Sequence, residues 1–417
     1  MSIRILIFAV ILFLIDLYVF QGVKLLIQNK SVITQRIVFW VYWSITALTI
    51  FTIFLGQWID WHTWPKALRV YIFAMIFIVS LSKIIVTIFM LLDDVIRLFR
   101  FAFGWIALKF SSSPEASESF RVSRLDFLVK TGFILSAIPF FSLIYGMVKG
   151  AYNYQIHRRN IAFKDLPEPF HGMKIVQISD LHTGSFNTTE HLAKAVELIM
   201  NEKPDVIFFT GDLVNDIHTE ALPFKEIFQR LSAPHGVFSI LGNHDYGDYY
   251  NWPNIESKNE NLEKLKAFHG EVGWTLMLNE HTYLEKDGAK IGLIGVENYS
   301  GKKNFSRYGD MQKATENYEV QGVNILLSHD PSHWNTQITN EYRYVDLTLS
   351  GHTHGMQFGI EIPGFKWSPV QYMYKQWADL YEQEHQKLYV NRGLGFLGYP
   401  GRVGILPEIS VFNLTKA

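Results

Sequence analysis

The chain has 417 residues, enough for two or three domains that each bury a hydrophobic core. Its formal net charge is −1 and it contains no cysteine, which excludes disulfides, thiolate metal sites and the strongly basic surface of a nucleic-acid-binding protein. Apolar residues are concentrated in the first 150 positions, and the remainder has the composition of a soluble domain.

Four consecutive segments are long and apolar enough to cross a membrane as helices. A spanning helix needs about 20 apolar residues, and these segments carry at most one charge each. They are residues 5–22, 37–59, 70–92 and 131–148. Because four such segments in a row disfavour buried soluble helices, residues 1–150 are predicted to form a transmembrane region of about four helices.

Charged residues refine this prediction. Asp16 and Lys83 lie inside two of the segments, and are predicted either to pair within the membrane or to face the bundle or the interface separately. Residues 97–110 are too short and too basic to span, and are predicted to form an interfacial amphipathic helix. Basic residues are nearly balanced between the two sides, so they do not orient the protein in the membrane.

From Met173 the pattern changes to short strands alternating with helices. The serine-rich stretch 111–119 is predicted to be a loop, and residues 151–170 a linker. Strand patterns such as 173–179 and 206–210 flank helical ones, which predicts a layered α/β domain.

Polar side chains follow five of the predicted strands. They lie in the motifs Asp-Leu-His (180–182), Gly-Asp (211–212), Gly-Asn-His-Asp (242–245), His-Asp (329–330) and Gly-His-Thr-His-Gly (351–355). Open sheets place their sites at the carboxyl ends of strands. Since residues i and i+2 of an extended segment point to the same side, Asp180 with His182 and His352 with His354 are each expected to face one cavity.

These motifs supply seven candidate metal ligands. They are Asp180, His182, Asp212, Asn243, His329, His352 and His354. Seven donors exceed the three or four protein ligands of one catalytic metal, and they suit two divalent ions about 3.5–4 Å apart. The nitrogen and oxygen donors fit Mn, Fe, Zn or Mg, and do not distinguish among them.

The five motifs, in this order, resemble those of the calcineurin-like metallophosphoesterase superfamily. The segments 390–395 and 406–414 resemble its bacterial membrane-associated branch, and the resemblance covers about residues 171–415. It implies that residues 171–417 form a calcineurin-like metallophosphoesterase domain with two packed mixed β-sheets flanked by helices. The expected fold is therefore an N-terminal α-helical transmembrane bundle followed by this α/β (α+β) domain.

The resemblance also implies roles for the candidate residues. One metal would be held by Asp180, His182 and His354, the second by Asn243, His329 and His352, with Asp212 bridging the two. Hydroxide generated between the metals would attack phosphorus. His244 is surplus to the ligand set and is the candidate catalytic acid that protonates the leaving group.

The sequence departs from the family pattern at two positions. Many family members carry an aspartate three residues after that of Gly-Asp, which orients the acid histidine, whereas this chain has Asn215 followed by Asp216. Related bacterial sequences often have glycine where this chain has Met356, which is expected to narrow the cavity or to pack. Asp245 is expected to orient His244 or to cap a turn.

Two further features near the C-terminus have two interpretations each. Arg392 is a candidate substrate-binding residue that would clamp a phosphate, or a partner in a structural salt bridge. The aromatic segment 364–381 is expected to form a membrane-facing lip or acyl-chain groove, or a layer that covers the core.

We therefore expect a multi-pass membrane hydrolase, in a bacterial cell (inner) membrane, that cleaves a phosphodiester or pyrophosphate bond. Its expected partners are the lipid bilayer and a phosphorylated substrate. This substrate is either amphiphilic, such as a phospholipid head group or a lipid-linked nucleotide sugar pyrophosphate, or a soluble phosphodiester. The alternatives are a membrane sensor or transporter that binds a phosphorylated ligand without turnover, and a scaffold with a redundant site.

Overall fold

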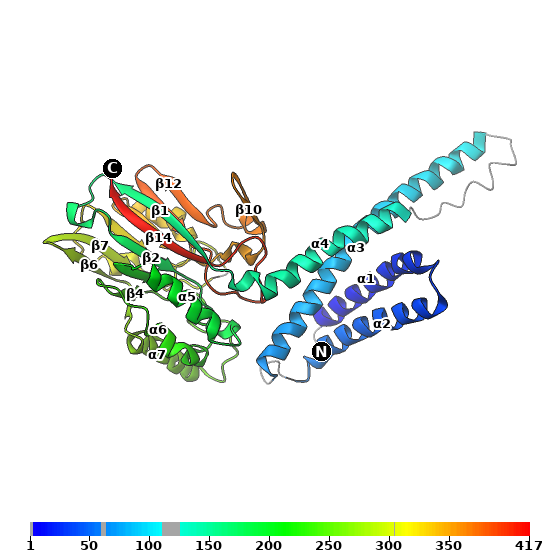
Figure 1. Cartoon of the computed structure of the whole chain (residues 1–417), viewed down its shortest axis with the longest axis horizontal. Coiled ribbons are helices and arrows are strands. Elements are labelled where there is room, and N and C mark those ends of the chain that lie inside the picture. The colour runs from blue at the N-terminus through cyan, green and yellow to red at the C-terminus, as the bar shows by residue number, and fades with distance from the viewer. Residues whose placement is uncertain (1–2, 60–63, 111–125, 304) are drawn as a thin grey trace. The chain divides into compact units, whose positions relative to one another are not determined.

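The computed structural model of the protein describes residues 3–59, 64–110, 126–303 and 305–417 (Figure 1). The chain forms two compact units, Met1–Ile144 and Tyr145–Ala417. The predicted serine-rich loop 111–119 lies outside the described residues.

The N-terminal part forms four long helices: α1 (Ile3–Ile27), α2 (Val32–Leu55), α3 (Lys66–Phe110) and α4 (Asp126–Val148). All four are long and apolar enough to cross a membrane, which confirms the prediction of four long apolar helices. Many of their large apolar side chains are exposed, as expected for helices that contact lipid on their outer faces.

Helix α3 corrects one prediction. Residues 97–110 are not a separate interfacial helix but the continuation of α3, which has 45 residues. No proline interrupts this stretch, so nothing in the backbone ends the helix after the apolar segment. At 1.5 Å per residue α3 is about 68 Å long, roughly twice the thickness of a bilayer's hydrocarbon core.

The two charges inside the predicted spans form an ion pair, as one of the two interpretations predicted. Lys83 Nζ lies 2.6 Å from Asp16 Oδ1 and 4.7 Å from the ring centre of Tyr42. The Tyr42 hydroxyl donates a hydrogen bond of 2.8 Å to the main-chain carbonyl of Asp16. Pairing offsets part of the cost of placing each charge among apolar helices.

The second unit contains two six-stranded mixed sheets and a small hairpin. The first sheet has, in spatial order, β1 (Gln155–Phe163), β14 (Glu408–Lys416), β2 (Lys174–Ile178), β3 (Val206–Phe209), β4 (Val237–Ser239) and β5 (Thr275–Leu276). The second has β12 (Asp379–Gln383), β13 (Gln386–Val390), β9 (Leu347–Ser350), β8 (Asn324–Leu327), β7 (Ala289–Gly295) and β6 (Glu280–Lys286). The hairpin consists of β10 (Ile360–Ile362) and β11 (Phe365–Trp367).

One hydrophobic core lies between the two large sheets. Apolar residues of both sheets share one buried cluster, such as Ile175 and Phe208 from the first sheet with Leu327 and Leu347 from the second. The outer face of the first sheet is covered by α5 (Glu190–Asn201), α6 (Lys225–Phe228) and α7 (Ile255–Glu271), as Figure 1 shows. Two shorter helices, α8 (Met311–Ala314) and α9 (Thr339–Glu341), complete the unit. This arrangement is the two-sheet α/β fold that was expected.

The segment 151–170, predicted to be a linker, belongs to the domain. Its strand β1 pairs in parallel with β14 from Gln155 to Phe163 and forms the edge of the first sheet. Only Ile161 and Phe163 in β1 have buried side chains. A strand with so few buried side chains needs little alternation of polar and apolar residues. The sequence therefore did not predict this strand.

Candidate metal centre

The candidate ligands follow the ends of strands that the two sheets bring together. Asp180 follows β2, Asp212 follows β3 and Asn243 follows β4, while His329 follows β8 and the last two histidines follow β9. Strands β2, β3 and β4 are mutually parallel, as are β8 and β9, so their carboxyl ends meet at common edges.

The backbone at these residues is unusual. Positive φ angles occur at five of the seven candidates: Asp180 (51°), His182 (46°), Asp212 (60°), His352 (71°) and His354 (50°). A non-glycine residue in this conformation costs roughly 1 kcal/mol or more. Such strain gathers at functional sites, because the surrounding structure holds side chains in positions that an ordinary loop would not give them.

One group of converging donors consists of Asp180, His182 and His354. Their ligand atoms lie within 4.8 Å of one another, and all three side chains are buried. His354 Nε2 is 3.0 Å from His182 Nε2 and 3.2 Å from Asp180 Oδ1. The main-chain N–H of His352 donates to the carboxylate of Asp180 and fixes its orientation.

A second group consists of Asp212, His329 and His352, again with ligand atoms within 4.8 Å of one another. His329 Nδ1 donates to the carbonyl of Thr210 at 2.7 Å, which leaves Nε2 as the atom that faces the group. Asn243 joins this group, since its Oδ1 lies 2.7 Å from His352 Nδ1.

Asp212 connects the two groups. Its Oδ2 atom lies 3.5 Å from His182 Nε2 in the first group and 3.1 Å from His329 Nε2 in the second. Its Oδ1 atom accepts a hydrogen bond of 2.9 Å from the main-chain N–H of His244. One carboxylate therefore reaches both donor groups, and the structure brings all seven candidate ligands together.

The chemistry of this donor set fits divalent cations. Nε2 of His329 is buried and makes no well-directed hydrogen bond, although Asp212 lies 3.1 Å away. Burial alone would lower the pKa of His329, but the carboxylates of Asp212 and Asp180 outweigh burial and raise this pKa to about 10. The two buried carboxylates thus require positive charge beside them, which a metal ion would supply in place of the proton.

His244 lies beside the two groups and is half-buried. Its ring packs edge-on against that of His182, with 5.0 Å between the ring centres. Its Nδ1 atom donates to the main-chain carbonyl of Asn215 at 2.8 Å. The main-chain carbonyl of Asn215 therefore fixes the orientation of the His244 ring through Nδ1.

Asp245 caps its own turn, as one of the two interpretations predicted, and also bonds to a second loop. Its carboxylate accepts hydrogen bonds from the main-chain N–H groups of Gly242, Asp212, Leu213 and Val214. The bond from Gly242 lies within the turn 242–245, and none of these bonds contacts the His244 ring. The other three tie the loop after β4 to the loop after β3, and so hold Asp212 in register with His244.

Three residues near the ligands were not among the candidates. The hydroxyl of Tyr374 lies 2.9 Å from His352 Nε2 and donates to Asp330 Oδ2 at 3.2 Å. Glu220 accepts the main-chain N–H of Asn215 at 2.6 Å and so supports the carbonyl that orients His244. Asp330 directly follows the candidate ligand His329, and Tyr374 lies in the aromatic segment 364–381, so both residues were partly indicated by the sequence. Nothing in the sequence indicated Glu220.

The contacts of Arg392 match the salt-bridge interpretation and not the phosphate clamp. The residue is fully buried and pairs with Glu408 and Glu361. These carboxylates occupy its guanidinium group, which leaves it no open face toward a substrate. Met356, expected to narrow the cavity or pack, is 49% exposed and has a φ of 55°.

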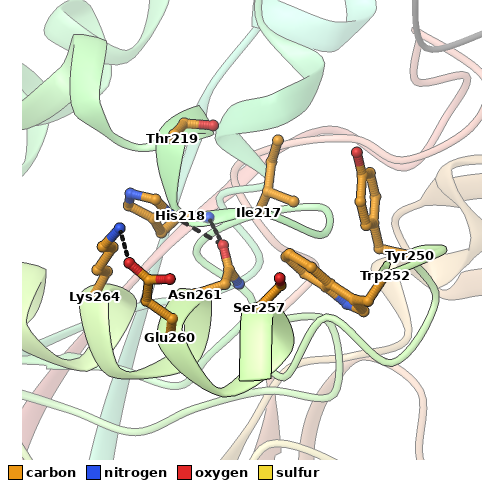
Figure 2. Close-up of a pocket in the computed structure, with 9 residues that line it drawn as sticks. All are labelled: Ile217, His218, Thr219, Tyr250, Trp252, Ser257, Glu260, Asn261 and Lys264. Carbon is orange, nitrogen blue, oxygen red and sulfur yellow. Dashed lines mark hydrogen bonds and ion pairs between the residues drawn. The ribbon is translucent and has the colours of Figure 1, made fainter. Parts of the chain in front are cut away.

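A separate pocket of about 250 Å³ lies between the loop after β3 and the start of α7 (Figure 2). It is lined by Ile217, His218, Thr219, Tyr250, Trp252, Ser257, Glu260, Asn261 and Lys264. Figure 2 shows Asn261 facing His218, whose main-chain N–H donates to Asn261 Oδ1 at 2.8 Å. None of the seven candidate ligands lines this pocket. Part of its lining belongs to the loop 215–220, which also contains Asn215 and Glu220, the residues that support His244.

Comparisons with known proteins identify the family of the chain. The calcineurin-like phosphoesterase family model matches residues 173–356, and a calcineurin-like phosphoesterase transmembrane domain model matches residues 2–151. The chain is 32% identical over 254 residues to the uncharacterized metallophosphoesterase YkuE of Bacillus subtilis, covering 60% of this chain and 81% of that protein.

Two other relatives have more specific names. The phosphodiesterase YaeI of Escherichia coli is 26% identical over 296 residues, which cover 70% of this chain and 99% of YaeI. The UDP-2,3-diacylglucosamine pyrophosphatase LpxG of Chlamydia muridarum is 29% identical over 269 residues, which cover 55% of this chain and 81% of LpxG. Together with the motif order and the two-sheet fold, these matches show that the chain belongs to the calcineurin-like metallophosphoesterases and carries the family's membrane domain.

Proposed function

We propose that this membrane phosphoesterase uses two divalent metal ions to hydrolyse a phosphodiester or pyrophosphate bond, and that its substrate is amphiphilic. The observation that carries the proposal is the position of Asp212, whose Oδ2 atom faces both donor groups. Two cations a few ångströms apart need such a shared ligand.

The proposed ligand sets follow the two groups. Asp180, His182 and His354 would hold one ion, and Asn243, His329 and His352 the other, with Asp212 shared. Bound divalent ions (Mn, Fe, Zn or Mg) would supply Lewis acidity toward the phosphoryl oxygens and lower the pKa of a nearby water. The chain itself orients the ligands through hydrogen bonds such as that from His329 Nδ1 to the carbonyl of Thr210.

His244 is proposed as the catalytic acid. Because its Nδ1–H is committed to the carbonyl of Asn215, the proton that it delivers to the leaving oxygen would be carried on Nε2. A correctly placed acid of this kind contributes typically about 10²–10⁴-fold to the rate.

The membrane domain and the relatives support the substrate class. The four apolar helices fix the catalytic unit to a bilayer, and one relative is named for a diacylated sugar nucleotide. We propose a lipid-linked phosphodiester or pyrophosphate as substrate, in the cell (inner) membrane of a bacterium.

The test is hydrolysis of bis-p-nitrophenyl phosphate and p-nitrophenyl phosphate by the full chain in detergent, with Mn²⁺ and then with chelator. Asp212→Asn is compared with Asp287→Asn, the same chemical change in the exposed turn between β6 and β7. The proposal predicts metal-dependent hydrolysis that is lost in Asp212→Asn and retained in Asp287→Asn. A folded, metal-loaded protein without turnover would instead support a sensor or transporter that binds a phosphorylated ligand.

A further inference from the structure

The hairpin β10–β11 has its charged face inward and its apolar face outward. Its cross-strand pairs are Ile360 with Trp367, Glu361 with Lys366, and Ile362 with Phe365. Ile360, Ile362 and Phe365 are 49%, 58% and 52% exposed. Since residues two apart in a strand share a face, one face of the hairpin consists of the two isoleucines, Phe365 and Trp367.

The opposite face of the hairpin is fixed to the domain by polar contacts. Glu361 pairs with the buried Arg392, at 2.5 Å between Oε1 and Nη2. Lys366 Nζ donates to the main-chain carbonyl of Ala378 at 2.6 Å and lies over the ring of Trp377. A hairpin that faced water would be expected to have the reverse arrangement, with its charges outside.

Neighbouring residues extend this apolar surface. Tyr372 and Met373 are 79% and 55% exposed, and Met356 is 49% exposed. We call Met356, Ile360, Ile362, Phe365, Tyr372 and Met373 the apolar rim. Glu361 and Lys366 are the only charged residues in the segment 356–373, and both contact the domain. The apolar rim itself therefore carries no charge that a binding partner could recognise.

The start of β10 is connected by main-chain hydrogen bonds to the end of α4, the last of the four apolar helices. Within the second unit, the carbonyl of Gly146 near the end of α4 accepts a hydrogen bond of 3.2 Å from the N–H of Arg402. The next residue, Val403, bonds through its N–H to the carbonyl of Gln357 and through its carbonyl to the N–H of Gly359. Gly359 directly precedes β10, and Gly146 lies in the candidate span Asp126–Tyr152. At about 3.3 Å per residue, β10 extends only about 10 Å from that point.

The rim also borders the candidate metal centre. Met356 lies two residues after His354, and Met373 precedes Tyr374, whose hydroxyl contacts His352. The carbonyl of Gly355, between His354 and Met356, accepts a hydrogen bond from the Ser368 hydroxyl of the segment after β11.

We propose that the apolar rim inserts into the interfacial layer of the membrane that the chain spans, so that the metal centre opens at the bilayer surface. A phosphorylated lipid could then present its head group to the site while its acyl chains stay in the bilayer. Aromatic and aliphatic side chains of this kind are favoured at membrane interfaces. The proposal rests on the proposed function for its substrate class, but the location of the rim is independent of turnover.

The absence of cysteine from the chain permits a direct test. Phe365→Cys and, as a control, Ile255→Cys at the exposed start of α7 are spin-labelled in the full chain and reconstituted in phosphatidylcholine–phosphatidylglycerol nanodiscs. Accessibility of the label to oxygen and to a water-soluble nickel chelate reports its depth. The proposal predicts a lipid-facing label at position 365 and a water-facing one at 255. A water-facing label at both positions would overturn the proposal, and so would shielding of position 365 from both reagents, which indicates a protein partner.

A second measurement separates this proposal from the proposed function. Ile362→Glu with Phe365→Glu is expected to lower hydrolysis of hexadecyl p-nitrophenyl phosphate in nanodiscs by about tenfold, with hydrolysis of bis-p-nitrophenyl phosphate unchanged. Equal rates on both substrates in the variant and the parent would contradict a role for the rim. Absence of hydrolysis in the parent protein would contradict the proposed function alone, since the depth measurement needs no turnover.

Discussion

Nδ1 of His244 donates a hydrogen bond of 2.8 Å to the main-chain carbonyl of Asn215. A carbonyl oxygen only accepts, so this bond assigns the proton to Nδ1 and directs Nε2 away from the loop after β3. Because this bond uses a main-chain atom of Asn215, a substitution of the Asn215 side chain is expected to leave the bond to His244 in place.

Replacement of His244 by alanine tests its role as an acid. The variant is expected to lose about 10²–10⁴-fold in kcat toward an alkyl phosphodiester, whose leaving oxygen needs a proton. The loss is expected to be much smaller for p-nitrophenyl esters, because p-nitrophenolate departs without protonation. Kinetics with both leaving groups, together with the metal content, check this. Equal losses on the two substrates would contradict the assignment.

Glu220 is expected to be a positioning residue. Its carboxylate accepts the N–H of Asn215, whose carbonyl orients His244. Glu220→Ala should lower kcat by about tenfold with KM and metal content unchanged, and Glu220→Gln should recover much of the loss because its amide oxygen still accepts the bond. A purely structural role would instead lower the unfolding temperature of both variants without this recovery in kcat.

Arg392 is expected to stabilise the fold rather than bind substrate. Arg392→Met leaves Glu408 buried without its cationic partner, and removing one member of a buried pair costs about 3–5 kcal/mol. The expected result is a lower thermal unfolding midpoint, followed by tryptophan fluorescence, with KM unchanged. Adding Glu408→Gln should restore part of the stability. An increased KM at unchanged unfolding temperature would favour the phosphate clamp.

Buried His269 makes stability depend on pH. Burial lowers its pKa to about 3, whereas an unfolded histidine has a pKa near 6.5. Between these values the unfolded chain binds a proton that the folded chain does not, so the free energy of unfolding falls by about 1.4 kcal/mol per pH unit as the pH decreases below 6.5.

His269→Asn should remove this contribution. Unfolding midpoints at pH 7 and pH 5 measure it, with the exposed His385→Asn as the control. The decrease in midpoint between the two pH values is expected to be smaller in His269→Asn than in the parent or the control. An identical decrease in all three proteins would show that His269 does not cause the pH dependence.

The sequence was most informative where residue type and spacing depend on chemistry. The four spans followed from apolar length, and the seven donors followed from motifs at strand ends. Features set by tertiary contacts were not visible in this way. Strand β1 was missed because only two of its side chains are buried. Helix α3 continues past its apolar segment because no helix-breaking residue ends it, and this continuation has no hydrophobic pattern that would have predicted it. The support of His244 by Glu220 and Asn215 runs through main-chain atoms, which no side-chain motif encodes.

The proposed mechanism requires that the chain hold two divalent ions that share Asp212. The most direct measurement is the number of Mn²⁺ ions bound per full-length chain in detergent, determined by elemental analysis after removal of free metal. We expect two ions per chain in the parent protein and in Asp287→Asn, and fewer in Asp212→Asn. One ion per chain in the parent, or an unchanged count in Asp212→Asn, would contradict it.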